Sequence, residues 1–438
     1  MSVYNYNKKV FLIKKYLFIS FIALFFFLVL IISYGFIKKN NPLFFSQLFN
    51  TSLLNIKTTK SYISGILKDG TKYYFYADNL SKDINNLINQ TNVPLLNPVI
   101  NLEIKNKTSV VILAKEALLN NSLKTVNLNK DVFIKSSNDF KANLENLLYN
   151  INSGNLSSSG VVLAEYNNHN INALGVDVNK NIIKTGSVEI INPLKNIYIK
   201  SNSLILDDNN KILTLIGDSF FKNKNLSLKA NRIVVKYLNL NSSKDNIENI
   251  RATDSVIIEI LNNTANTALI TGYQYIYSSK DDIMVITTNK EIKKSSVIYS
   301  SKNINIKAYD RLEYQPNKLT LIAWGEPSLT LRTFKNDIIN ETYTLSAKTL
   351  TAKLNDNKKD ISTAEAFNSV VFLFKNETIR SDYALFNNLE RTIVFLNNVS
   401  IKDDKKTIQG CKLIVKLDDN ITELISCNDA NNKIEVKR

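Results

Sequence analysis

A short pattern of apolar and small residues recurs along the chain and constrains its fold more than any other feature. Written as apolar, any, small, any, any, apolar, any, apolar, the pattern falls on Leu228, Ala230, Ile233 and Val235. Eleven copies, spaced 28 to 42 residues apart, begin at residues 75, 112, 140, 171, 199, 228, 270, 306, 345, 379 and 408. A period of this length indicates a repeat architecture in which each unit packs mainly against its neighbours.

Each copy alternates apolar and polar residues, as a strand with one buried face does. Polar clusters such as residues 207–210 and 354–360 separate the strands, and a second strand precedes many copies, as at 185–191. Two strands cannot bury a face alone, so the stacked units should share one apolar interior. The two residues after each small position break the alternation and predict a corner or bulge there. The expected fold is an all-β, elongated, folded-over antiparallel sheet, with a helical turn or two at residues 82–90 and 141–150.

The N-terminal region contains a long apolar segment. Residues 16–37 carry no charged side chain, and at about 1.5 Å per residue they span a hydrocarbon core about 30 Å thick. A transmembrane helix is therefore predicted. Four lysines precede it and two follow, which favours a cytoplasmic N-terminus at residues 1–15 and an exported remainder. A cleavable signal peptide is the alternative, but its apolar core would be only about 7 to 15 residues long.

The composition argues against most kinds of chemistry. The chain is 44% hydrophobic, enough for a large core, and its net charge of +16 comes from scattered lysines that form no nucleic-acid-binding stretch. The only histidine, His169, stands in a turn-like segment and is expected in an exposed loop. No phosphate-binding loop, zinc-protease motif or CxxC pair occurs, and the acidic residues stand mostly at turns. The sequence therefore predicts a protein that is not an enzyme and uses no cofactor or metal.

The two cysteines flank a predicted hairpin. Pairing Leu417 with Ile421 places Cys411 opposite Cys427. Opposed Cβ atoms in antiparallel strands lie about 4.5 to 5.5 Å apart, slightly long for a disulfide but within adjustment. A cross-strand disulfide is one hypothesis for an exported chain. Two buried free thiols are the other.

Several segments resemble a known family. The stretches SGILKDGTKYYFYADNL (64–80), TSVVILAKEALLNN (108–121), 128–150 and 171–191 resemble the LptC proteins of bacterial lipopolysaccharide export, over residues 1 to about 195. From there to the end the chain resembles the LptA (OstA-type) periplasmic bridge, most closely at residues 378–426. The resemblance implies two tandem domains, at residues 45–195 and 196–438.

The resemblance also implies a fold and a function. Members of these families form V-shaped β-jellyrolls whose apolar groove holds the acyl chains of lipopolysaccharide. This chain is thus expected to be an inner-membrane, single-pass bridge component with its bulk in the periplasm. Its implied partners are lipopolysaccharide, the inner-membrane ABC transporter for lipopolysaccharide export, and further bridge or outer-membrane assembly proteins that stack on its edge strands. No nucleic acid is implied.

Residues of this chain can be assigned to functional positions of the family only through these motifs. Gly65 and Gly70 correspond to the family's glycines in the first strand pair. The expected groove residues are the apolar positions Phe75, Ile112, Ile171, Leu204, Ile233, Val235, Leu350, Phe386, Leu413 and Val415. The alternative function is a membrane-anchored β-solenoid or adhesin-like interaction protein, in which the same residues only pack a core.

Overall fold

The fold is known from a computed structural model, which describes most of the chain beyond residue 61. The described residues are 62–66, 70–78, 91–103, 109–120, 122–137, 139–166, 168–179, 182–207, 209–223, 226–237, 247–261, 268–301, 303–335, 338–355, 361–374, 377–403, 406–418, 421–427 and 433–437. The predicted transmembrane helix at 16–37 and the helical turn at 82–90 lie outside them. Within the described ranges no helix has the length and apolar character needed to cross a membrane.

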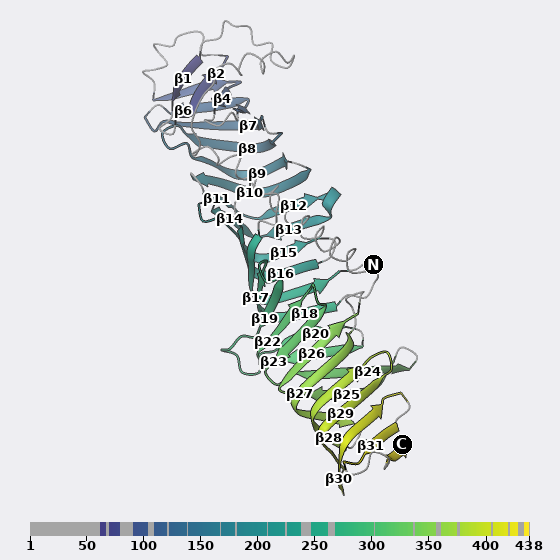
Figure 1. The fold of residues 1–438 in the computed structure, drawn as a ribbon. Helices are drawn as coiled ribbons and strands as arrows, with labels where there is room; N and C mark the ends of the chain where they lie inside the picture. Colours follow the sequence, from purple (N-terminus) through teal and green to yellow (C-terminus); the bar gives the residue numbers. More distant parts are fainter. Residues whose placement is uncertain are drawn as a thin grey trace. The chain divides into compact units, whose positions relative to one another are not determined.

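The chain divides into two compact units. Among the described residues, the N-terminal unit contains 62–221 with 236–237, and the C-terminal unit contains 222–235 with 247–437. In Figure 1 the first runs from purple to teal and the second is mostly green to yellow. The strands of the N-terminal unit are β1 (Tyr62–Ile66), β2 (Lys72–Tyr76), β3 (Asn92–Leu96), β4 (Val99–Glu103), β5 (Ser109–Leu113), β6 (Glu116–Asn120), β7 (Thr125–Ser136), β8 (Lys141–Asn150), β9 (Leu156–Tyr166), β10 (His169–Asn179), β11 (Ile182–Thr185), β12 (Val188–Asn192), β13 (Ile197–Ser201), β14 (Ser203–Asp207) and β15 (Ile212–Lys222).

The C-terminal unit is likewise built from strands. They are β16 (Leu226–Tyr237), β17 (Ile247–Ile260), β18 (Ala268–Ser278), β19 (Ile283–Thr287), β20 (Val297–Ser300), β21 (Ile304–Ala308), β22 (Arg311–Gln315), β23 (Thr320–Trp324), β24 (Ser328–Lys335), β25 (Ile338–Ser346), β26 (Thr349–Leu354), β27 (Ile361–Phe374), β28 (Glu377–Asn387), β29 (Thr392–Lys402), β30 (Thr407–Lys416), β31 (Ile421–Ile425) and β32 (Lys433–Lys437). In the described ranges the only helical element is a short 3-10 turn, η2 (Pro193–Lys195). The predicted all-β class is confirmed.

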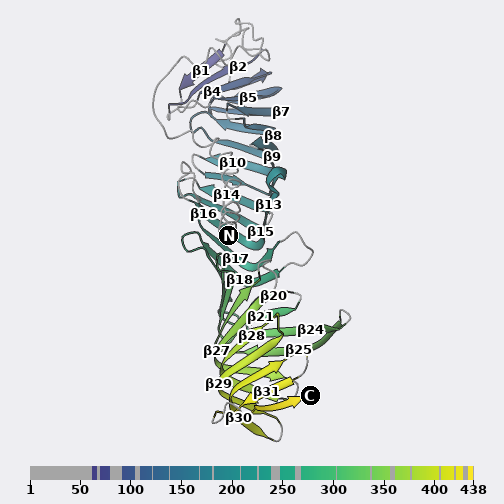
Figure 2. The ribbon, with the colours of Figure 1, turned by 45° about the vertical axis from the view of Figure 1, so that its right-hand side comes forward.

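Each unit is an antiparallel sheet folded into two walls, because its long strands pair with different partners along their length. In the C-terminal unit, β27 pairs with β26 through residues 361–367 and with β25 through 371–373. Its neighbours β28 and β29 run alongside it in both views (Figures 1 and 2). We call the side holding β26 the first wall and the side holding β25 the second wall. In the N-terminal unit β10 divides in the same way between β11 and β12.

The corners between the walls contain pairs of residues in the left-handed backbone conformation. Asn368 and Ser369 have φ of 64° and 52°, and Asn397 and Asn398 have φ of 62° and 51°. The strand register shifts beside each pair, since two residues there face one on the neighbouring strand. Lys130–Asp131 and Asp254–Ser255 form the same kind of pair. Asn and Asp tolerate this conformation better than most residues, which explains the polar dipeptides inside otherwise apolar strands.

The small position of the repeat faces these corners. Ser381 lies opposite Val370, the residue that follows the pair Asn368–Ser369, and Gly410 lies opposite Val399 in the same way. A Cβ atom added to Gly410 would lie 2.6 Å from the side chain of Leu424 and 2.9 Å from a backbone oxygen. The bend therefore leaves little space at this position, which accounts for a small residue there.

The structure refines the predicted corner. In β16, Leu228, Ala230, Ile233 and Val235 are buried, so the alternation changes phase between Ala230 and Ile233 as the pattern predicts. The left-handed pairs, however, lie in the strand before a copy, as in β27 and β29, and not in the copies themselves. Two neighbouring strands thus make each such corner together.

Two local predictions were wrong. Residues 141–150 form strand β8 and no helical turn. His169 is not in an exposed loop: it is 1% exposed at the start of β10, with the Nδ2 atom of Asn192 3.2 Å from its ring nitrogens. The alternation of β10 turns the His169 side chain inward together with Ile171.

Candidate functional site

The first wall of the C-terminal unit contains a continuous row of buried side chains. Each member lies directly opposite the next on a neighbouring strand, and opposed Cβ atoms are about 4.5 to 5.5 Å apart. The row consists of Ala252, Tyr275, Ile286, Leu312, Ala323, Leu350, Ala366, Ala384, Phe395, Leu413 and Leu424. Phe386 and Val415 belong to the next row of the same wall, where both face Ile393. An apolar path thus crosses eleven strands of this unit.

The second wall of the C-terminal unit carries a matching row. Its members are Ile258, Ile270, Tyr299, Ile306, Leu329, Leu345, Phe372, Ile379 and Ile401, and all are buried. The two walls touch through aromatic rings, because the centroids of Phe372 and Phe395 are 5.4 Å apart. Phe372 also packs against Tyr343 and Phe374. The space between the walls is therefore filled by side chains at this level.

The N-terminal unit contains a similar row. Its buried members, again opposed strand by strand, are Phe75, Ile100, Ile112, Ile134, Ala142, Ala164, Ile171, Ile190 and Ile199. Leu204 lies in another row of this unit, between Thr185 and Leu215. Three of the four groove residues predicted for this unit thus share one row.

The predicted groove residues all face the interior of their units. None of the ten is more than 6% exposed, and Val235, Leu350, Phe386, Leu413 and Val415 are 0% exposed. The groove residues predicted from the sequence did not include the second-wall aromatic Phe372, nor the alanines Ala366 and Ala384, which face each other across β27 and β28. The alternation of buried and exposed residues in β27 and β28 is the sequence signal that could have identified these alanines as inward-facing.

A small apolar cavity lies between the walls of the N-terminal unit. Its volume is about 50 Å³, and Ile171, Leu204 and Phe140 are among its lining residues. About 10 to 15 Å³ of such volume holds one water molecule, so the cavity has room for a few waters and is too small for an acyl chain. A long apolar ligand could be accommodated at this point only if the walls moved apart.

The interior of the C-terminal unit also contains tyrosines. Burial raises the pKa of the Tyr275 phenol far above its ordinary value of 10.0. For Tyr343, burial is again the largest cause of a raised pKa, and a hydrogen bond that its hydroxyl donates to Glu341 adds to it. Both side chains therefore remain neutral through the physiological range, and the interior gains no charge from them.

The two predicted glycines occupy different positions in the first hairpin. Gly65 faces Tyr73 across β1 and β2, and a Cβ added to it would lie 2.3 Å from the Tyr73 hydroxyl. Gly70 precedes β2 with φ of 85°, in the left-handed region that glycine adopts at no steric cost. The first glycine thus makes room for a ring, and the second permits a turn.

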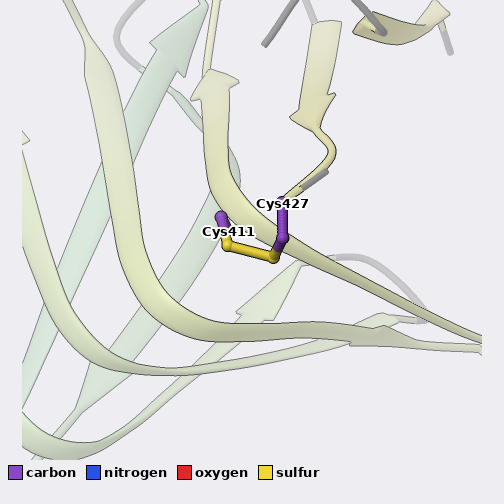
Figure 3. Close-up of a disulfide and its surroundings, with 2 residues drawn as sticks. All are labelled: Cys411 and Cys427. Atoms are coloured by element: carbon purple, nitrogen blue, oxygen red, sulfur yellow. A yellow bond between two sulfur atoms is a disulfide. The ribbon is translucent and has the colours of Figure 1, made fainter. Parts of the chain in front are cut away.

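A disulfide joins Cys411 of β30 to Cys427, just beyond the end of β31 (Figure 3). Their Cα atoms are 4.9 Å apart, inside the usual range of about 4.4 to 6.8 Å. The register differs from the predicted one, since Lys416 and not Leu417 faces Ile421. Cys427 is therefore one residue past the position opposite Cys411, and the chain has already left the strand there.

Among the described residues, no group of three or more His, Cys, Asp or Glu side chains is placed to hold a metal ion. What the described part of the interior offers is apolar surface. Such a site can bury an apolar ligand, and each methylene group transferred from water is worth about 0.8 kcal/mol.

Comparisons with known protein families match two consecutive segments of the chain. Residues 63–199 match the family described as lipopolysaccharide-assembly, LptC-related. Residues 198–311 match the family described as LptA/(LptD N-terminal domain) LPS transport protein. A search of curated proteins found no match. Strands after residue 311 lie outside both matched ranges, yet they continue the rows of the C-terminal unit.

One solved structure that matches is LptH from Pseudomonas aeruginosa, the LptA homologous periplasmic component of its lipopolysaccharide transport device. It is 13% identical, and the match covers 30% of this chain and 84% of that chain with a TM-score of 0.25. The two family matches follow each other along the sequence in the order that the motifs indicated. The chain is an LptC-like domain fused to an LptA-like domain.

Proposed function

We propose that this protein is an inner-membrane-anchored bridge component that carries lipopolysaccharide across the periplasm. The LptC-like and LptA-like domains support a periplasmic bridge for lipopolysaccharide transport. The observation that carries the proposal is the set of unbroken apolar rows, which run across nine strands in one unit and eleven in the other. An acyl chain lying along such a row would remain out of water from strand to strand.

The proposed arrangement assigns a role to each segment. Residues 16–37 anchor the chain, residues 1–15 remain cytoplasmic, and the domains at 45–195 and 196–438 hold the acyl chains of lipopolysaccharide in their interiors. The inner-membrane ABC transporter for lipopolysaccharide delivers the lipid to the first domain. Further bridge or outer-membrane assembly proteins pair with the last strands, because a strand edge offers free backbone hydrogen-bonding groups.

The proposal requires the walls to separate during transport. The cavity in the N-terminal unit is about 50 Å³, and Phe372 contacts Phe395 between the walls of the C-terminal unit. Opening the walls disrupts side-chain packing. Burying several acyl chains, which is worth about 0.8 kcal/mol per methylene group, would compensate for that loss.

Photocrosslinking tests the proposal. A benzophenone amino acid replaces inward-facing Ile171 or Ile233 in the full-length chain, and the matched controls replace exposed Asn172 and Arg232 on the same strands. In membranes that contain lipopolysaccharide, crosslinks to the lipid are expected from the inward positions alone. Absence of lipid crosslinks from both inward positions, or equal yields from the exposed ones, would contradict the proposal and favour an interaction protein with a merely packed core.

A further inference from the structure

The N-terminal unit has two inward-facing rows of different chemistry on the wall that contains β12. The apolar row described above crosses this wall at Ala164, Ile171 and Ile190. Side chains two positions apart in a strand point to the same face of the sheet. Two positions from the members of the apolar row lies a second inward row, which we call the rim row: Ser136, Phe140, Tyr166, His169, Asn192 and Ile197. None of its members is more than 6% exposed, yet four of the six carry a polar group.

The rim row lies at the outer end of this wall, where its strands end. His169 is the first residue of β10, and Asn192 is the last residue of β12. At the opposite end of the wall β10 changes its partner from β12 to β11, which marks the corner. The small apolar cavity adjoins both rows, since Phe140 and Ile171 are among its lining residues. An apolar part of a ligand that lies inside this wall would therefore have its end beside the rim row.

His169 and Asn192 form the polar centre of the rim row. Each is 1% exposed, and the Nδ2 atom of Asn192 is 3.2 Å from both ring nitrogens of His169. An amide N–H group can only donate, so the hydrogen bond requires a ring nitrogen that carries no proton. The imidazole ring in this arrangement is therefore neutral, with one donor nitrogen and one acceptor nitrogen.

Stability alone does not explain a polar pair at this position. A hydrogen bond inside a protein contributes little net stability, and replacing both partners with apolar groups of the same shape can be neutral or stabilising. The nearby residues Ile171 and Ile190 are 6% and 0% exposed, which shows that large apolar side chains fit this wall. A polar ligand group that meets the pair would account for polar side chains in this place.

The composition of the rim row indicates which ligand group fits. His169 and Asn192 place donors and acceptors side by side, and the hydroxyl groups of Ser136 and Tyr166 can act as either. No lysine, arginine or carboxylate belongs to the row. A phosphate buried here would lack a cationic partner, which makes its burial costly. The row therefore matches a neutral amide, ester or hydroxyl group that is attached to an apolar chain.

We propose that the His169–Asn192 pair binds the linkage region of an acylated sugar, where amide or ester groups join the acyl chains to the sugar ring. The choice of ligand rests on the proposed function, since lipopolysaccharide contains linkages of this kind. The acyl chain would lie along the apolar row, and its carbonyl group would exchange hydrogen bonds with the pair. The acyl chain and its polar linkage would then both lie on the inner face of one wall.

Native mass spectrometry of the full-length chain in mild detergent tests this subsite. The probes are a glucosamine that carries one amide-linked and one ester-linked acyl chain, and the free fatty acid of the same chain length. The variant His169→Phe/Asn192→Leu should bind the acylated glucosamine about tenfold more weakly than the parent does. It should bind the fatty acid as the parent does. Its melting temperature should equal or exceed that of the parent, because both polar partners are replaced together.

The matched control is Ser201→Ala/Ser219→Ala. These two hydroxyl groups are 3.3 Å apart and buried in the same unit, and that of Ser201 also donates to backbone oxygens. Their hydrogen bonds are made within the chain, so the control variant should lose stability but bind both probes as the parent does.

Three results would overturn the subsite. The first is a parent chain that binds neither probe or binds both equally. The second is unchanged binding of the acylated glucosamine by the His169→Phe/Asn192→Leu variant. The third is a lower melting temperature of that variant with equal weakening for both probes, which would show that the pair only packs the core. Lipid crosslinking from Ile171 and Ile233 is scored in parallel. Crosslinks without a preference for the acylated glucosamine would reject the subsite and keep the transport proposal, while the preference without crosslinks would do the reverse.

Discussion

Phe372 and Phe395 contact each other across the interior of the C-terminal unit, although they belong to opposite walls. Both rings are 0% exposed. This contact, with Tyr343 and Phe374 beside it, holds the walls together where the proposed lipid path passes.

Removing the ring of Phe372 should destabilise the C-terminal unit strongly. Phe372→Ala is expected to lower the free energy of unfolding by about 3 to 5 kcal/mol, because a large buried side chain is lost and a cavity remains. Leu373→Ala, one residue along the same strand and 51% exposed, should change it by about 0.5 kcal/mol or less. Urea denaturation followed by circular dichroism measures both, and similar midpoints for the two variants would contradict the interior role of Phe372.

A charge in the apolar interior of the C-terminal unit should abolish lipid binding. Val415→Asp places a carboxylate where the parent side chain is fully buried, at a cost on the order of 3 to 5 kcal/mol. Lipopolysaccharide that copurifies with the protein should be lost, whereas Gln409→Asp on the exposed face of β30 should retain it. Val415→Thr, which keeps the shape of the side chain, distinguishes lost folding from lost binding. A folded Asp variant that still carries the parent amount of lipid would argue against the groove.

The disulfide should stabilise the C-terminal end. Cys411 and Cys427 are 16 residues apart, and a loop of about this size is worth about 3 kcal/mol in the chain-entropy model. Cys411→Ser/Cys427→Ser should therefore unfold at lower urea concentration and become insensitive to reductant. The mass of the parent chain after alkylation should increase only when it is first reduced. Ready alkylation of both thiols without reductant would show that the bridge is absent.

The glycines of the N-terminal unit should differ in their tolerance of a side chain. Gly186→Ala, in the turn between β11 and β12, brings a Cβ to within 2.5 Å of the backbone oxygen of Leu174, so the backbone must shift. Gly65→Ala meets the tip of the Tyr73 ring, which is only partly buried and can rotate away. The first variant should lower the melting temperature more than the second. Adding Tyr73→Ala should remove most of the cost of Gly65→Ala but leave that of Gly186→Ala unchanged.

Stability at high pH should depend on Tyr275. Burial raises the pKa of its phenol above the unfolded value of about 10, so the folded state favours the neutral form. The stability gained from this group is present below pH 10 and is lost as the pH rises further. Tyr275→Phe has no proton to lose there. Its melting temperature should fall less than that of the parent between pH 9 and pH 11. Equal falls in the melting temperatures of the two proteins would exclude ionisation of the phenol as the cause.

Much of the fold follows from period-two alternation, which specifies the buried face of a strand directly. Ile233, Val235 and Leu350 are inward for this reason. The alternation does not specify which residues of two neighbouring strands pair with each other. In the last hairpin, for example, Ile421 was predicted to pair with Leu417 but pairs with Lys416.

The wrong prediction for β8 has a physical cause. The buried residues of β8 are Ala142, Leu144, Leu147 and Tyr149, which are two, three and two positions apart. The spacing of three arises because a bulge interrupts the alternation there. A spacing of three, followed by Leu148, imitates one face of a helix.

The left-handed pairs at the corners also bear on how such a chain could acquire its length. Each corner is specified within a short segment, such as Asn397–Asn398 and the facing Gly410, and requires nothing from distant parts of the sequence. Duplicating one repeat in the gene would therefore insert strands that already contain their own bend and extend the apolar rows in register. Bridges of different reach could arise in this way without redesign of any existing contact.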